Sequence, residues 1–245
     1  MITGIIVALP EELGTLTRKK IAAGGISSLS ATVMVACAGA GIDNAGRAAG
    51  MLIERGCTRL VSWGCAAGLD ADLRPGDLLL PEVLIAENRE QLPVDADWHR
   101  RAATLLDNTC TPVTRPLCES SRLVASSAAK QTLRNNLGGC AVDMESAAIA
   151  RTAARHGLPF LVIRSIADPA EMDLPRAIDH ALDEQGRVRM GRLLRFIARH
   201  PLEIPGLIRL GRHFHAATHR LEHIAQDLER IVSCPTGRTA IQQLT

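Results

Sequence analysis

The segment CAVDMESAAIARTAARHGLPFLVIRSIAD, residues 140–168, decides how this 245-residue chain folds. Its apolar start and the run FLVI at 160–163 are each typical of a buried strand, and the alanine-rich pattern between them predicts a helix. Gly157 and Pro159 mark the end of that helix. Strand, helix and strand in this order predict an α/β sheet, in which the run at 160–163 is a buried parallel strand. Acidic residues follow each strand, at the edge where such sheets bind ligands.

The acidic residues at these two strand ends have two interpretations. Asp143 and Glu145 begin the predicted helix, where carboxylates complement the helix dipole, and Asp168 lies before Pro169 as an ordinary turn residue would. The paired motifs V-D-M-E-S-A and, about twenty residues later, I-R-S-I-A-D-P favour a binding site instead. Together these motifs resemble the superfamily of purine nucleoside phosphorylases and methylthioadenosine/S-adenosylhomocysteine nucleosidases.

The resemblance implies a role for each motif. Met144 and Glu145 would hold the ribose, and Asp168 would protonate the departing purine, which burial of its carboxyl favours. Glu12 lies in G-I-I-V-A-L-P-E-E-L near the N-terminus, which resembles the nucleosidase opening whose glutamate positions or activates the attacking water. Without the resemblance, this glutamate is equally well explained as a helix-dipole partner.

Two glycine-rich turns after predicted strands are candidates for the nucleophile site. Gly39 and Gly41 follow one apolar strand, and Gly64 with Cys65 follow another, so backbone amides there can approach an anion closely. The first turn lacks a third spaced glycine and a Lys-Ser/Thr pair, which excludes a dinucleotide site and a P-loop. The resemblance implies that all four residues line the pocket for phosphate or water.

Two departures from the resembled family bear on the choice of nucleophile. Cys65 replaces the usual hydroxyl residue, and Ser62 stands where bacterial purine nucleoside phosphorylases have a phosphate-binding arginine. A thiol is a weak donor and the arginine fork is missing from this segment, which disfavours phosphate unless Arg18 or another distant arginine substitutes. Water and phosphate therefore both stay open as the nucleophile.

The purine site is implied by the resemblance alone. Counting back from Glu145, Leu123 matches the residue whose backbone reads the purine edge, and Val142 and Ala167 are the further predicted base contacts. Arg122 stands where the nucleosidases have a stacking phenylalanine. The missing aromatic wall predicts altered base stacking or a substrate of different shape.

Composition limits the class of protein. Hydrophobic residues make up 47% of the chain, so it can bury a sizeable core, and a formal charge of +2 gives no basis for nucleic-acid binding. Aromatic residues make up only 2%, which argues against a base-stacking platform for single strands. Seven scattered cysteines, with no secretory leader and no apolar stretch of about 18 residues, predict reduced thiols in a cytoplasmic protein.

The predicted fold is a single α/β domain with a mixed, partly barrel-like central sheet flanked by helices, as in the nucleoside phosphorylases. This domain covers residues 1–200, and residues 201–245 form a basic helical extension packed on or beside it. The remaining expectations along the chain are strands at 58–63 and 111–117, a turn at 64–68, an irregular loop at 82–95, and helices at 96–106, 126–133 and 186–199.

The C-terminal extension is rich in histidine and arginine. Four histidines fall within eleven residues: His213, His215, His219 and His223. No Asp or Cys joins them at ligand spacing, so no metal site is expected. A basic amphipathic helix suits a membrane surface or a partner subunit, and a solvated basic face on a final core helix explains the same pattern.

The resemblance implies cleavage of the N-glycosidic bond of an adenosyl substrate, with release of adenine. The two motifs and the long basic tail look most like the hopanoid-associated phosphorylases, whose expected substrate is adenosylhopane, a lipid-linked adenosine. A methylthioadenosine/S-adenosylhomocysteine-type nucleosidase and a non-catalytic nucleoside-binding protein are the alternatives. No cofactor is expected, apart from phosphate as a co-substrate. The family implies a homodimer, and the tail suggests peripheral contact with the inner face of the membrane.

Overall fold

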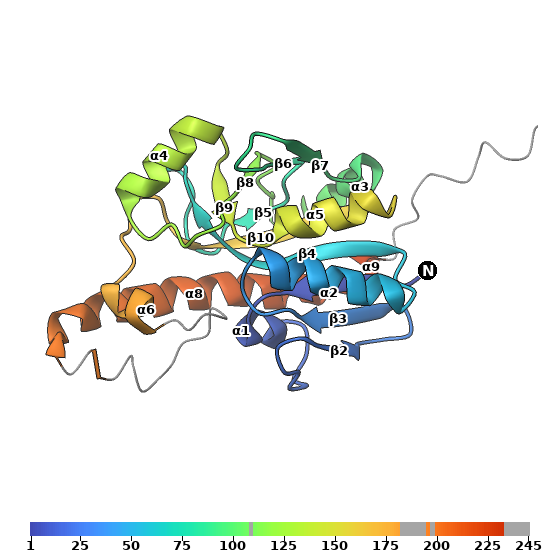
Figure 1. The fold of residues 1–245 in the computed structure, drawn as a ribbon, viewed down its shortest axis with the longest axis horizontal. Helices are drawn as coiled ribbons and strands as arrows, with labels where there is room; N and C mark the ends of the chain where they lie inside the picture. Colours follow the sequence, from blue (N-terminus) through green and yellow to red (C-terminus); the bar gives the residue numbers. More distant parts are fainter. Residues whose placement is uncertain (108–109, 182–194, 197–198, 233–245) are drawn as a thin grey trace, which may run out of the picture.

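The computed structural model of the chain describes residues 1–107, 110–181, 195–196 and 199–232 (Figure 1). The strands are β1 (Thr3–Val7), β2 (Gly25–Ser28), β3 (Val33–Cys37), β4 (Arg59–Gly68), β5 (Leu78–Leu79), β6 (Val83–Ile85), β7 (Gln91–Pro93), β8 (Leu117–Glu119), β9 (Ala141–Asp143) and β10 (Phe160–Asp168). The helices are α1 (Pro10–Gly14), α2 (Ile42–Glu54), α3 (Ala96–Asp107), α4 (Ser127–Leu137), α5 (Ser146–Arg155), α6 (Arg176–Ala181), the short 3-10 helix η1 (Pro201–Glu203), α8 (Ile204–Ala225) and α9 (Leu228–Val232).

The strands form one mixed sheet organised around β4. This strand pairs in parallel with β1 and with β10, and its last residues pair antiparallel with β9. From β9 the sheet continues through β8 and β6 to β7, while β3 and β2 extend it beyond β1. The long apolar runs of β1, β4 and β10 are buried, as parallel strands covered on both faces require. The prediction of one α/β domain with a mixed sheet and flanking helices is confirmed.

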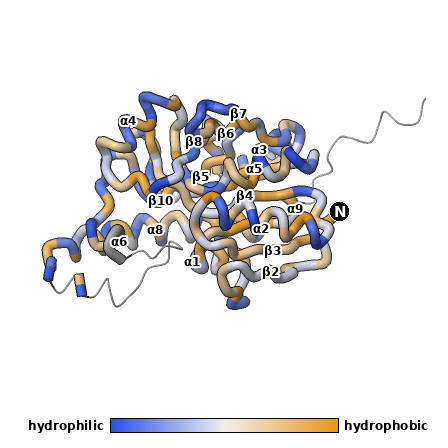
Figure 2. Tube along the Cα trace, viewed as in Figure 1, coloured by the Kyte–Doolittle hydropathy of each residue, from blue (hydrophilic) through white to orange (hydrophobic). Residues whose placement is uncertain are grey.

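Helices cover both faces of the sheet because successive side chains of its strands point to opposite sides. In β10, Phe160 and Val162 face a core that includes the alanines of α2 and α5, whereas Leu161 and Ile163 face a second core with residues of α3, α8 and α9. The small alanine side chains let α2 and α5 pack side by side (Figure 1). Figure 2 shows hydrophobic residues along the central strands and alternating hydropathy along α4.

Three local predictions are wrong. Residues 64–68 continue β4 instead of turning, since they gain hydrogen-bonded partners in β10 and β9. Residues 82–95 contain the hairpin of β6 and β7, and the strand expected at 111–117 begins only at Leu117, where pairing with β6 and β9 starts. In each case the available pairing partner decides the structure, and local propensity does not reveal it.

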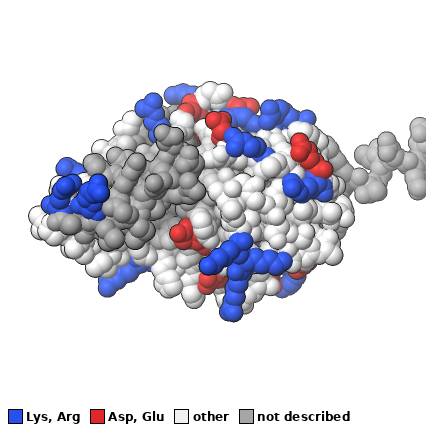
Figure 3. Space-filling view, turned by 60° about the horizontal axis from the view of Figure 1, so that its bottom comes forward, with Lys and Arg blue, Asp and Glu red and all other residues white. Residues whose placement is uncertain are grey.

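Helix α8 lies against β10 and extends past the sheet at the end where the helix begins (Figure 1). Leu202, Ile204 and Ile208 are exposed near this end, as are Arg209 and Arg212. Figure 3 shows Lys and Arg side chains at the same tip of the molecule. Among the helices that the structure describes, none is long and apolar enough to cross a bilayer.

The C-terminal helices are also part of the core. Leu221 and Ile224 of α8 and Ile231 of α9 are buried in the second core, against the sheet. The predicted boundary at residue 200 stays a prediction, and the helix expected at 186–199 lies largely outside the described residues.

Candidate active site

The register of three neighbouring strands brings the acidic motifs to one region. Between β10 and β4, Arg164 pairs with Gly64 and Asp168 pairs with Ala67. Ala67 also pairs with Val142 of β9, so Asp168 and Val142 lie on either side of one β4 residue. Segments far apart in the sequence therefore meet at this part of the sheet, as expected for a site at strand ends.

Glu12 of α1 is buried, with only 3% of its surface exposed, and its carboxylate is held at three points. Its Oε2 accepts hydrogen bonds from the Ala8 and Leu9 amides at 3.0 Å each, and its Oε1 accepts one from the Cys65 amide at 2.7 Å. Burial raises the pKa of Glu12, and the opposing effects of Arg164 and the three amides do not reverse that shift. A fixed carboxylate with a raised pKa suits a general base.

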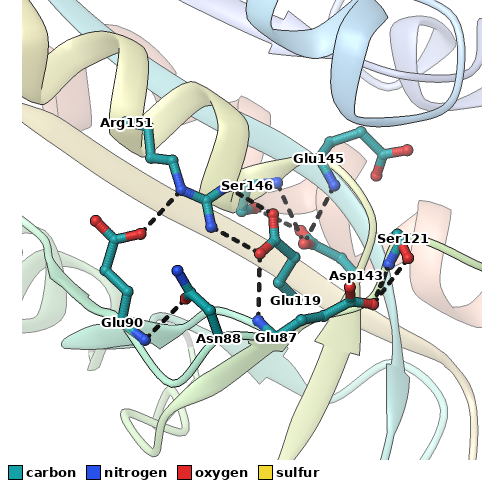
Figure 4. Close-up of polar contacts among 9 residues, drawn as sticks. All are labelled: Glu87, Asn88, Glu90, Glu119, Ser121, Asp143, Glu145, Ser146 and Arg151. Carbon is teal, nitrogen blue, oxygen red and sulfur yellow. Dashed lines mark hydrogen bonds and ion pairs between the residues drawn. The ribbon is translucent and has the colours of Figure 1, made fainter.

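Asp143 and Glu145 lie next to each other at the start of α5 but have different partners (Figure 4). Asp143 accepts hydrogen bonds from the Ser146 amide at 3.2 Å and from the Ser146 hydroxyl. Glu145 accepts one from the Gly41 amide at 2.9 Å, which links α5 to the glycine turn before α2. Burial, and then repulsion from Asp143, raise the pKa of Glu145 to about 7. Glu145 therefore exchanges its proton near neutral pH.

Arg164 of β10 supplies the buried positive charge beneath these carboxylates. Its Nε lies 2.7 Å from Asp143 Oδ2, and its Nη2 donates to the hydroxyls of Ser62 and Ser146 at 2.7 and 3.0 Å. Burial lowers the pKa of this guanidinium, but the surrounding carboxylates, Asp143 first among them, outweigh burial and raise it. Arg164 is only 1% exposed, so it compensates the buried acids and offers no open fork to a substrate anion.

Asp168 ends β10 with its two carboxylate oxygens in different environments. Its Oδ2 lies 2.7 Å from the Lys130 ammonium, whereas its Oδ1 is buried without a hydrogen-bond partner among the described residues. Burial raises the pKa of Asp168, and the hydrogen bond and charge of Lys130, which lower it, do not cancel that effect. One oxygen is thus anchored and the other is free, in a carboxyl whose protonated form is favoured by burial.

These elements correspond to a known family. A family model described as the phosphorylase superfamily matches residues 3–199, a stretch that contains the ten strands described above and every predicted site residue. The chain belongs to the phosphorylase superfamily. This membership confirms the predicted class of enzyme, which cleaves an N-glycosidic bond, and it disfavours the non-catalytic alternative.

This superfamily member is similar to named proteins in sequence and in fold. The 5′-methylthioadenosine/S-adenosylhomocysteine nucleosidase of Mycobacterium bovis is 29% identical, and the match covers 69% of this chain and 86% of the relative. The Helicobacter pylori nucleosidase of the same name superposes with a TM-score of 0.69 at 18% identity, covering 94% of this chain and 97% of that one. The futalosine hydrolase of Helicobacter pylori superposes with a TM-score of 0.69 at 17% identity and the same coverage.

The residues of this superfamily member that were predicted to line the pocket for phosphate or water lie around the buried carboxylates. The amides of Gly41 and Cys65 bond Glu145 and Glu12, respectively. Gly39 has a φ of 84°, a left-handed conformation that favours glycine. Burial raises the pKa of the Cys65 thiol well above its ordinary value, so this thiol stays protonated. The structure brings these residues together, and their roles stay predictions.

The residues predicted to contact the ribose and the purine are more widely spread. Met144 is half-buried between the two acids of its motif, and Val142 and Ala167 are buried on strands that flank β4. Leu123 is 40% exposed and lies in the loop after β8, where the Ser120 amide donates a hydrogen bond to the Asp143 carbonyl of β9 at 2.9 Å. Leu123 is therefore the one predicted contact that lies at the surface.

Sequence reasoning misses Arg164, Ser146 and Lys130. A distant arginine is left open by the sequence as a substitute for the one missing at Ser62, and Arg164 reaches that hydroxyl from the neighbouring strand. Arg18, named as a distant substitute, is exposed at the surface. The signal for Arg164 was present in its motif: a charged residue within a strand that is otherwise apolar needs a buried partner.

Replacing Gly64 with alanine is expected to disturb Glu12, the candidate general base. A Cβ there would collide with the Glu12 carboxylate and the Arg164 guanidinium, so one of them must move. We expect a loss of about 1–3 kcal/mol in unfolding free energy together with reduced activity. Gly50→Ala in α2 is the control, since its Cβ meets nothing within 4 Å. Urea unfolding and an activity assay compare the two variants, and equal behaviour would contradict this packing argument.

The raised pKa of Glu145 predicts pH-dependent stability. A folded-state pKa of about 7, above the ordinary 4.5, means that the folded protein keeps a proton which the unfolded chain has released. The unfolding free energy therefore falls as pH rises between these values. Glu145→Gln cannot lose stability in this way. At about pH 8 its unfolding free energy should exceed that of the wild type by about 1–3 kcal/mol. Denaturant unfolding at acidic and alkaline pH measures this difference in unfolding free energy. Glu54→Gln, at an exposed position, is the control. Lower stability of Glu145→Gln at alkaline pH would contradict the assignment.

Proposed function

We propose that this enzyme hydrolyses the N-glycosidic bond of an adenosyl substrate, with water as the nucleophile. One observation carries the choice of water. The backbone amides that an anion would use are already bonded to carboxylates of the chain: Cys65, Ala8 and Leu9 to Glu12, and Gly41 to Glu145. A phosphate dianion would have to displace these acids or lie beside them, which is electrostatically unfavourable.

The proposed reaction uses the two sides of the site. Asp168, protonated, donates its proton to N7 of the purine as the bond between C1′ and N9 breaks. Water attacks the resulting ribosyl cation at C1′, and Glu12 accepts the proton that the water loses. Glu145 and the Met144 backbone orient the ribose hydroxyls. The products are adenine and the free 5′-substituted ribose, and proton exchange with solvent restores both acids.

The substrate within this class is the finer part of the proposal. Relatives named as methylthioadenosine/S-adenosylhomocysteine nucleosidases support a small 5′-thio substituent. Adenosylhopane is the second candidate, because the exposed apolar residues Leu202, Ile204 and Ile208 lie beside exposed arginines at the tip of α8. This combination suits contact with an anionic membrane that carries a lipid-linked substrate. A homodimer is likewise proposed from the family resemblance.

A substrate panel separates the two candidates. Adenine release is measured by liquid chromatography from methylthioadenosine, from S-adenosylhomocysteine and from an adenosine with a long 5′-alkyl chain. Turnover of the alkyl compound well above the other two supports the lipid-linked substrate, and efficient turnover of methylthioadenosine supports the ordinary nucleosidase. Release of adenine from none of them would contradict the proposed function.

A further inference from the structure

Lys130 of α4 is an unusual buried cation beside the proposed acid. The chain has three lysines, at positions 19, 20 and 130, and the first two are exposed while Lys130 is 0% exposed. A buried ammonium is costly unless every donor finds an acceptor. Its presence there needs an explanation in terms of its partners.

The ammonium of Lys130 is fully used by three acceptors. Its Nζ lies 2.7 Å from Asp168 Oδ2 and donates to the carbonyls of Pro169 and Met172, both at 2.8 Å. An ammonium has three N–H donors, and three acceptors match that number. Lys130 therefore joins α4 to the end of β10 and to the turn that follows it.

This anchoring leaves a single orientation for the acid. With Oδ2 held by Lys130, the other oxygen of Asp168 is buried without a hydrogen-bond partner among the described residues. Asp173 is the other charged group that acts on Asp168: its charge favours the protonated form, and the charge of Lys130 favours the ionised form. Asp173 is itself held by the Ser127 amide of α4 at 2.7 Å.

We propose that Lys130 is a positioning residue for cleavage of the glycosidic bond, which holds Asp168 so that its free oxygen meets N7 of the purine. It also sets the pH above which Asp168 no longer carries the proton. This inference rests on the proposed function, in which Asp168 is the general acid.

Lys130→Met tests both parts. We expect kcat to fall by up to about 100-fold, since a misplacement of the order of 1 Å has that effect on a catalytic group. The alkaline limb of the pH–rate profile should move to higher pH, because the ammonium no longer favours the ionised form of Asp168. Lys130→Gln keeps amide donors for the two carbonyls without the charge and should show the same alkaline shift. The exposed Lys20→Met is the control and should match the wild type.

Two results would overturn the proposal: wild-type kcat in both Lys130 variants, or a reduced kcat with an unmoved alkaline limb. If neither Lys130 variant folds, the pairing of Lys130 with Asp168 is tested by NMR of the wild-type and Asp168→Asn proteins labelled with ¹⁵N-lysine. The buried Lys130 ammonium should give a slowly exchanging signal that shifts in Asp168→Asn, and an unchanged signal would overturn the pairing. Failure of the proposed function looks different, because the wild-type enzyme itself would then release no adenine.

Discussion

Replacing Glu12 with glutamine should lower the rate of adenine release by about 10²- to 10⁴-fold, the usual contribution of a general base. The single carbonyl oxygen of glutamine can still accept from the Ala8 and Leu9 amides, which share one oxygen of Glu12, but glutamine cannot take a proton from water. Binding should therefore change less than kcat, and steady-state kinetics with a fluorescent or chromatographic adenine assay measures both.

The neighbouring glutamate provides the control for this variant. Glu11 precedes Glu12 on α1 and is exposed, so Glu11→Gln changes charge equally without touching the site. Wild-type kcat is expected for Glu11→Gln. If both variants behave alike, or if Glu12→Gln keeps most of its activity with an intact far-ultraviolet circular dichroism spectrum, Glu12 is not the base.

A comparable loss, about 10²- to 10⁴-fold, is expected for Asp168→Asn. The asparagine side chain can donate a hydrogen bond to N7 through its NH2 group and accept one from Lys130 through its oxygen. It has no acidic proton to transfer to the leaving purine. The wild-type enzyme should lose activity above the pKa of Asp168, which burial raises, and the variant should lack this alkaline limb. Stopped or continuous assays across pH record the two profiles.

The choice of leaving group sharpens the Asp168 test. A nucleoside with an activated leaving group that departs without protonation should be cleaved by Asp168→Asn at nearly the wild-type rate. Asp97→Asn, on the exposed side of α3, is the matched control and should leave both substrates unaffected. Equal losses on both substrates would show that Asp168 acts in another way than as an acid.

The sequence was sufficient for the order of the main elements and for the acidic motifs. The strand–helix–strand segment 140–168 is predicted correctly because its two apolar runs flank an alanine-rich helical pattern, and Gly157 with Pro159 ends the helix clearly. The turn expected at 64–68 fails because only its pairing with β10 and β9 makes this segment a strand. Pattern within a segment is thus visible in the sequence, while pairing between segments is not.

The same distinction explains the residues of the site. Glu12, Glu145 and Asp168 stand in recognisable motifs. Arg164 also lies in one of these motifs, but its importance, like that of Lys130, comes from partners in other elements: Arg164 meets Ser62 of the neighbouring strand β4, and Lys130 meets Asp168 thirty-eight residues later. Only the folded chain shows that each of these two buried cations has a carboxylate beside it, Asp143 for Arg164 and Asp168 for Lys130.

The measurement that tests the central claim most directly is a single incubation in ¹⁸O-labelled water, with and without phosphate. The enzyme is given the adenosyl substrate that it turns over best, and the sugar product is identified by mass spectrometry. We predict a free ribose that carries one ¹⁸O atom at C1 under both conditions, provided the product is analysed before the label exchanges, and a rate that phosphate does not increase. A ribose 1-phosphate product that forms only with phosphate would contradict the account.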